Sequence, residues 1–177
     1  VEKAWTVTQI INRYPGKFRR FYETVLPKTS STPQNFPLLR YSDVLLMYAE
    51  ADNYMNQGPT PKALESINQV RRRAYGLPVS SPSTVDLDMN ISYEDLLKEI
   101  KDERSRELSF ECLRKRDLVR WGDFLKNMKE VYSQVIDIDA NSRAVPVYRN
   151  VSKRDELWPI PAYEMGVNSS LVQNFGW

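Results

Sequence analysis

The residues best suited to chemistry in this sequence are three glutamates at helical spacing. Glu103, Glu107 and Glu111 recur at every fourth position, which places their carboxylates on one side of a helix. Carboxylates in such an array can serve as general acid and base or as metal ligands. The sequence contains no histidine, so it lacks the Glu-x-x-His pairs of di-iron bundles and any imidazole-based triad. The catalytic alternative is a carboxylate-based glycoside hydrolase that uses these residues.

The same segment also places charges on the side of the helix that should be buried. On a helical wheel, Arg104, Glu107 and Glu111 fall within one apolar arc. The apolar residues of that arc are Leu96, Leu97, Ile100 and Leu108. An unpaired charge in an apolar environment is costly, so these side chains must either pair or face a site. Because arginines surround them, we favour pairing and predict a structural ion-pair network. Its members are Arg104, Glu107, Glu111, Arg116, Asp117 and Arg120.

Composition excludes several functional classes. A chain of 177 residues suits one domain with a substantial core. Its 25 basic and 23 acidic residues leave a net charge of +2, which is too balanced for a nucleic-acid-binding surface. No apolar run approaches the roughly 18 residues of a membrane-spanning helix. The single cysteine, Cys112, excludes an internal disulfide, and without histidine as a base we interpret it as a small, packed helix residue.

One segment partly matches a calcium-binding loop. Asp137, Asp139 and Asn141 have the spacing that opens an EF-hand. Ser142 and Tyr148 then occupy the positions that need glycine and a bidentate glutamate. We therefore predict a solvated loop, with no metal and no cofactor bound, and leave a weaker calcium site open.

Helix signals predict a hairpin over residues 42–75. Ser42 is the expected N-cap of the first helix, and Thr60 followed by Pro61 is the expected start of the second. Gly76 ends the second helix, and the preceding arginines 71–73 are interpreted as a solvated last turn. The hairpin has the size of one tetratricopeptide unit. The face of the first helix that we expect to be buried comprises Val44, Met47, Tyr48, Ala51, Tyr54 and Met55.

The remaining elements also favour helices. Ser92 and Asp95 form a capping box that opens a long helix, which we expect to break near residues 112–115. A further amphipathic helix covers residues 124–138. The tail is rich in proline and aromatic residues, with a helical turn near 163–165, and only residues 144–148 suggest a strand. The predicted fold is mostly all-α, a tetratricopeptide-like hairpin plus further helices, with long loops and an extended C-terminal tail. We predict a single domain over 1–177, composed of an irregular lead-in (1–37), a helical core (38–138) and a wrapping tail (139–177).

Three segments share their order and spacing with one known protein family. They are residues 40–51 with Ala63 and 68–73, residues 103–122, and residues 158–161 with Glu164, Asn168 and 173–174. Together they span residues 40–177, and in this combination the chain resembles the SusD/RagB family. Two positions depart from the family pattern: Cys112 stands where glycine is usual, and Ser169 stands where proline is common.

The resemblance implies a non-catalytic protein that binds an oligosaccharide or polysaccharide. It implies a surface-exposed lipoprotein of the outer membrane that delivers the glycan to a SusC-type TonB-dependent transporter. Family members are usually several hundred residues long and carry an N-terminal lipidated cysteine. The chain is thus expected to be a C-terminal part, with membrane attachment only through a lipid anchor that lies outside it.

The resemblance also implies that the recognisable motifs build the scaffold while other residues contact the glycan. Sugars stack their apolar faces on aromatic rings and bond to nearby amides and charges. The glycan-binding candidates are therefore aromatic residues outside the helical core pattern, with their polar neighbours. They are Trp5, Tyr14, Tyr22, Tyr148, Arg149 and Asn150. A different class of function, an intracellular tetratricopeptide-like adaptor that binds peptides, is the alternative suggested by the 42–75 hairpin.

Overall fold

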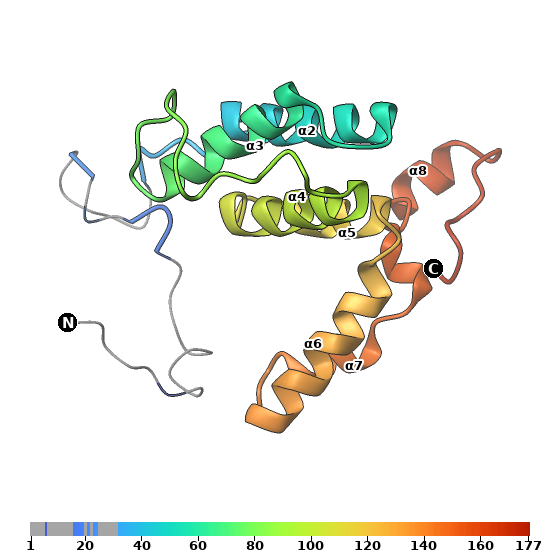
Figure 1. The fold of residues 1–177 in the computed structure, drawn as a ribbon. Helices are drawn as coiled ribbons and strands as arrows, with labels where there is room; N and C mark the ends of the chain where they lie inside the picture. Colours follow the sequence, from blue (N-terminus) through green and yellow to red (C-terminus); the bar gives the residue numbers. More distant parts are fainter. Residues whose placement is uncertain (1–5, 7–15, 20, 22, 25–31) are drawn as a thin grey trace. The chain divides into compact units, whose positions relative to one another are not determined.

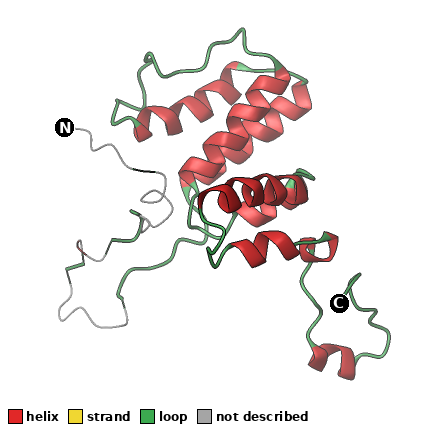
Figure 2. Cartoon of the chain, turned by 90° about the horizontal axis from the view of Figure 1, so that it is seen from below, coloured by secondary structure: helices red, strands yellow, loops and turns green. Residues whose placement is uncertain are grey.

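The described part of the chain is helical. The computed structural model describes residues 6, 16–19, 21, 23–24 and 32–177. Within these residues helices and loops occur and no strand does (Figure 2), which confirms the all-α prediction. None of the described helices is both long enough and apolar enough to cross a bilayer.

The described residues divide into two compact units. We call Pro15–Arg114 the hairpin unit, and we call the Lys115–Trp177 part of the other unit the C-terminal unit. The division lies inside the helical core that was predicted for residues 38–138. The single-domain organisation therefore stays a prediction, and the two units are described separately below.

The hairpin unit packs three helices together. Helices α2 (Tyr41–Asn56), α3 (Pro61–Ala74) and α4 (Tyr93–Glu107) lie side by side (Figure 1). Their shared core consists of Leu46, Ala49, Ala63, Leu64, Ile67, Val70, Leu96 and Ile100. The predicted hairpin of residues 42–75 is thus present, with α4 covering it.

Side-chain caps mark the starts of α3 and α4. The Thr60 hydroxyl accepts the backbone N–H of Ala63 at 3.1 Å, as expected of an N-cap, and Pro61 follows it. The Ser92 hydroxyl accepts the backbone N–H of Asp95 at 3.0 Å. The prediction for Ser42 was wrong. Helix α2 already begins at Tyr41, and Ser42 is buried inside its first turn.

The face that α2 buries is also different from the predicted one. All six predicted positions are exposed; Met55, for example, retains 78% of its accessible surface. The buried residues after the first turn are Leu46, Ala49 and Asn53. The small Ala49 side chain allows neighbouring helices to approach closely, and the Asn53 amide donates to the Tyr93 carbonyl at 3.1 Å. A hydrogen bond to the start of α4 and close packing have therefore outweighed side-chain hydrophobicity in orienting the helix.

Arg72 corrects the interpretation of the arginine run. Its side chain is only 2% exposed, so the last turn of α3 is not simply solvated. The guanidinium binds Glu65 through two bonds of 3.0 Å and Asp86 through a bond of 2.8 Å at Nε. Hydrogen bonds from Arg72 lower the pKa of both carboxyls, which outweighs the opposing effect of their burial. This buried arginine fixes the loop after α3 onto the helix.

Helix α4 ends earlier than predicted. It stops at Glu107, and a turn precedes α5 (Arg114–Arg120). Phe110 and Cys112 both have a φ of 62°, in the left-handed region that a helix cannot contain. Glu111 therefore lies in the turn, and Cys112 is exposed there instead of being packed in a helix. Glycine adopts a positive φ without steric cost, which explains why the SusD/RagB pattern usually has glycine at the position of Cys112.

The C-terminal unit is built from short helices and a tail. Helix α6 (Phe124–Ile138) packs against α7 (Val145–Asn150), and η2 (Lys153–Glu156) and α8 (Ala162–Val167) follow. The strand suggested for residues 144–148 was wrong, since this segment is the start of α7, with proline in its first turn. The helical turn expected near residues 163–165 is present as α8.

Candidate functional site

Arg40 is the centre of a cluster that holds Glu107, the last residue of α4, and Glu111 of the turn that follows. Its guanidinium donates to Glu107 Oε1 at 2.7 Å and to Glu111 at 2.9 Å (Nε to Oε2) and 2.7 Å (Nη2 to Oε1). Lys17 Nζ also bonds to Glu111 Oε1, and Arg73 bonds to the other oxygen of Glu107. The side chains of Glu107 and Glu111 are 7% and 3% exposed. Both carboxylates are thus buried and bonded on each oxygen.

This environment keeps Glu111 ionised. Burial by itself would raise the pKa of its carboxyl, but hydrogen bonds from Arg40 and Lys17 outweigh that effect and leave the pKa below its ordinary value. The same bonds raise the pKa of Arg40. A general acid needs a raised pKa so that it carries a proton near neutral pH. The environment of Glu111 instead lowers the pKa of its carboxyl, so Glu111 is not suited to act as a general acid.

The other members of the predicted ion-pair network lie in two places. Arg104 of α4 donates to Asp43 of α2 at 2.8 Å, and both side chains are buried. Asp117 and Arg120 pair with each other at 3.0 Å along α5, and Arg116 is exposed. That all six residues form one network stays a prediction.

Sequence reasoning did not identify Arg40 and Lys17 as partners of these glutamates. The apolar arc indicated that Glu107 and Glu111 must pair, but it could not select partners among 25 basic residues. Lys17 and Arg40 lie 94 and 71 positions away from Glu111. Local spacing carries no signal for a contact of that length.

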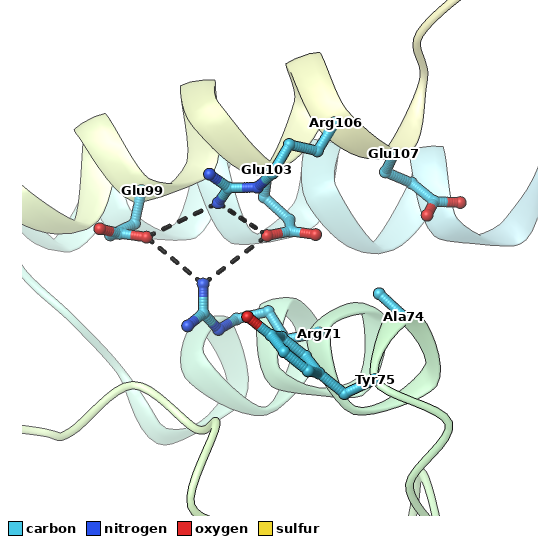
Figure 3. A pocket seen from close by; sticks show the side chains of 7 residues that line it. All are labelled: Arg71, Ala74, Tyr75, Glu99, Glu103, Arg106 and Glu107. Carbon is cyan, nitrogen blue, oxygen red and sulfur yellow. Dashed lines mark hydrogen bonds and ion pairs between the residues drawn. The ribbon is translucent and has the colours of Figure 1, made fainter. Parts of the chain in front are cut away.

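A polar pocket lies beside this cluster, between α3 and α4. Its volume is about 460 Å³, and it is lined by Arg71, Ala74, Tyr75, Glu99, Glu103, Arg106 and Glu107. Figure 3 shows that Arg71 reaches from α3 toward Glu99 and Glu103, and that Arg106 reaches the same two carboxylates along α4. The closest of these contacts joins Arg106 Nη2 to Glu103 Oε2 at 2.9 Å.

The pocket is suited to binding a polar, uncharged group. Two guanidinium groups, of Arg71 and Arg106, balance the nearby carboxylates of Glu99 and Glu103. The third carboxylate of the lining, that of Glu107, is paired with Arg40 and Arg73. Donors and acceptors therefore alternate along its wall, and Tyr75 adds an exposed ring. Hydroxyl groups of a sugar match such a lining, because each can both donate and accept. Across the described ranges, no group of three or more acidic or cysteine side chains is arranged to hold a metal ion.

The glycan-binding candidates from the sequence are only partly described. Trp5, Tyr14 and Tyr22 lie outside the described residues. Tyr148 is half-buried on α7, and Arg149 and Asn150 are exposed beside it. Asn150 also lines a cavity that contains Trp158 and Trp177, two residues that were not among the glycan-binding candidates from the sequence.

Comparison with known proteins identifies the family. The SusD family model matches residues 6–177. SusD-like protein P25 of Formosa agariphila is 32% identical over 137 residues, covering 77% of this chain and 23% of that protein. SusD-like protein P38 of the same organism is 41% identical over 100 residues, covering 56% of this chain and 19% of that protein.

A solved structure agrees with the sequence comparisons. The crystal structure of a SusD homolog from Bacteroides thetaiotaomicron VPI-5482 matches with a TM-score of 0.73 and 35% identity, covering 85% of this chain and 30% of that one. The chain spans about a quarter of the length of its curated relatives. With the family match extending over nearly the whole sequence, the chain belongs to the SusD family.

Proposed function

We propose that this chain is part of a non-catalytic, glycan-binding component of a nutrient-uptake system. The observation that carries the proposal is the match of the SusD family model over residues 6–177. We further propose, from the same family membership, that the complete protein is a surface-exposed outer-membrane lipoprotein. It would deliver an oligosaccharide to a SusC-type TonB-dependent transporter.

The geometry around α4 supports binding over hydrolysis. A glycoside hydrolase needs one carboxyl that carries a proton and a second that is free to attack or to activate water. Glu107 and Glu111 are buried and bonded to cations on each oxygen, and Glu103 pairs with Arg71 and Arg106. The adaptor alternative was based on the hairpin alone, and the family match accounts for the same hairpin.

The polar pocket of Figure 3 is the part of the hairpin unit best suited to sugar hydroxyls. Tyr75 would stack on an apolar sugar face, while Arg71 and Glu99 would exchange hydrogen bonds with hydroxyls. Tyr148, Arg149 and Asn150 remain proposed contacts in the C-terminal unit. Trp5, Tyr14 and Tyr22 remain proposed as well.

A glycan array followed by calorimetry tests the proposal. We expect the chain to bind at least one class of oligosaccharide and to release no reducing ends from it after prolonged incubation. Tyr75→Ala should weaken binding to a glycan held in the polar pocket, whereas Tyr54→Ala, which removes an equally exposed tyrosine from α2, should not. Hydrolysis of the bound glycan that Glu107→Gln abolishes in a folded protein would refute the non-catalytic assignment.

The proposed partner needs a separate experiment. Affinity purification of the complete, tagged protein from outer-membrane fractions should recover a TonB-dependent transporter. Recovery of the protein in a soluble cytoplasmic fraction, without a membrane partner, would contradict the proposed location.

A further inference from the structure

A second cavity, within the C-terminal unit, has walls of a different character from those of the polar pocket. Its volume is about 450 Å³, within the usual range for small-molecule sites. Three aromatic side chains line it: Phe124 of α6, and Trp158 and Trp177 of the tail. Trp158 keeps 74% of its surface exposed. An exposed indole ring offers an apolar face on which a sugar can stack.

Side-chain hydrogen bonds hold the backbone of the tail around Trp158. The Gln173 amide both accepts from the Ile160 N–H at 2.8 Å and donates to its carbonyl at 2.9 Å. The Asn174 amide donates to the Trp158 carbonyl at 2.6 Å. These side-chain bonds fasten the last residues to the segment that carries Trp158. A ligand would therefore meet a backbone that already holds Trp158 at the cavity, which lowers the entropy cost of binding.

Trp177 is fixed by a second set of contacts. Its indole N–H donates to the Arg154 carbonyl at 3.1 Å, and the Arg154 guanidinium lies 4.6 Å from the ring centre. Gly176, at a φ of 81°, permits this approach. A Cβ atom at that position would lie 2.7 Å from the Cβ of Arg154. The Arg154 guanidinium thus covers one face of the Trp177 ring and is held there by a cation–π contact.

The charge at the cavity wall is positive. Lys115 and Arg154 face a single carboxylate, that of Asp155. The Asp155 carboxylate already accepts the backbone N–H of Ser152 at 2.7 Å and its hydroxyl at 3.2 Å. Lys115 Nζ lies 4.2 Å from the ring centre of Trp158 and 5.7 Å from that of Phe124. Among the described residues, no carboxylate lies within ion-pair distance of this ammonium group.

We propose that this cavity binds a sugar residue that carries a carboxylate or a sulfate group. The sugar's apolar face would stack on Trp158, its anionic group would bond to the Lys115 ammonium, and the Asn150 amide would bond to a hydroxyl. A neutral sugar would leave the Asp155 carboxylate, which lies beyond ion-pair distance, as the one negative charge that the described cavity wall offers to this ammonium group. This inference rests on the proposed glycan-binding function and adds a class of ligand to it.

Calorimetry on the full 177-residue chain tests the inference with matched probes. The probes are a galacturonic acid trisaccharide, a sulfated galactose trisaccharide and an unmodified galactose trisaccharide, supported by an array of acidic and neutral glycans. We expect at least one acidic class to bind about tenfold more tightly than its neutral counterpart, as a charge-assisted hydrogen bond implies. The carboxylated and sulfated probes distinguish the two sources of negative charge. The preference should decline as salt concentration rises.

Variants locate the site. Lys115→Gln should bring the affinity for the acidic probe to about that for the neutral one, whereas Lys129→Gln, the same change at an exposed lysine of α6, should leave the preference intact. Trp158→Ala should lower the affinity for both the acidic and the neutral probe by about tenfold or more. Circular dichroism checks that each variant folds. Should Trp158→Ala fail to fold, the indole N–H signal of Trp177 in the unaltered protein provides a second measurement, since it should shift on addition of the acidic probe.

The outcomes separate this inference from the proposed function. Binding of glycans with no preference for acidic ones, or a preference that Lys115→Gln does not change, would overturn the acidic-sugar site and leave glycan binding in place. Absence of binding to every glycan by the folded chain would overturn both. Equal binding of a pentaglutamate peptide would show that charge alone is recognised, which also overturns the sugar site.

Discussion

At the scale of single residues, Arg40 pairs two of the three charges that the sequence placed on the apolar side of the helix, those of Glu107 and Glu111. Its planar guanidinium reaches two carboxylates at once, and it also donates to the Glu107 carbonyl at 3.0 Å. Lys17 donates to the carbonyl of Glu107, the last residue of α4, and to that of Ser109 in the following turn. Each buried acid therefore has its partners, and the cluster closes the end of α4.

Glu111→Gln tests the strength of this cluster. The substitution removes the charge that Arg40 and Lys17 share, so we expect the free energy of unfolding at pH 7 to fall by about 1–3 kcal/mol. The pKa of Glu111 is lower in the folded chain than its ordinary value of 4.5. Its ionised form therefore stabilises the fold above about pH 4.5, and this contribution is lost as the pH falls through the folded pKa.

Urea unfolding of both proteins from pH 7 to pH 3 checks this prediction. The gap in stability between the unaltered chain and Glu111→Gln should narrow as the pH drops below about 4.5. Glu94→Gln, an exposed position in the first turn of α4, is the control and should change stability little. A gap that stays constant over the whole pH range would contradict a role for the ionised carboxylate.

At the scale of elements, the turn between α4 and α5 determines where the long helical pattern is interrupted. Two non-glycine residues, Phe110 and Cys112, adopt positive φ there. The turn is held by a bond from the Glu111 N–H to the Leu108 carbonyl at 3.2 Å, in addition to the ion pairs of Glu111. Tertiary contacts have thus imposed a backbone conformation that these side chains disfavour.

Cys112→Gly should relieve this strain. A left-handed conformation costs a residue with a Cβ about 1–2 kcal/mol, whereas glycine avoids that cost but loses more entropy on folding. We expect a net gain in stability of about 0.5–1 kcal/mol, measured by urea unfolding. Cys112→Ala removes the thiol and keeps the Cβ, so it should bring no such gain. Equal stabilisation by both substitutions would mean that the thiol, and not the backbone, is responsible.

At the scale of the whole molecule, the two units differ in how much apolar surface they bury. The hairpin unit has a contiguous core of eight buried residues. The buried apolar side chains of the C-terminal unit are Leu118, Phe124 and Val145 among the described residues. Burial of apolar surface is the main stabilising contribution to folding, so we expect the C-terminal unit to open more readily.

Hydrogen exchange measured by mass spectrometry checks this expectation. Amides in α6 should exchange at least about tenfold faster than those in the centres of α3 and α4, because local opening of a weakly packed unit costs less free energy. Equal protection across both units would indicate a single cooperative domain, in agreement with the organisation predicted from the sequence.

The sequence by itself determined the features that depend on neighbouring residues. Thr60 with Pro61, Ser92 before Asp95, and Gly76 mark helix ends through local hydrogen bonds and backbone preferences, and the structure contains those ends. The order and spacing of the motifs between residues 40 and 177 were enough to indicate the family, which comparison confirmed. The capping signals act over a few residues, and the family is indicated by the order and spacing of motifs along the chain.

Only the tertiary structure decided which surfaces meet. In the folded chain, Leu46 and Ala49 of α2 face inward, whereas larger apolar residues of the same helix are exposed. Arg72 is buried, although its sequence context predicts a solvated helix end. The tertiary structure also brought Arg40 and Lys17 to the carboxylates at the end of α4, and Lys115 to the rings of the tail. Close packing and the pairing of buried charges are satisfied by residues distant in sequence, and no local pattern specifies which of many chemically equivalent partners is chosen.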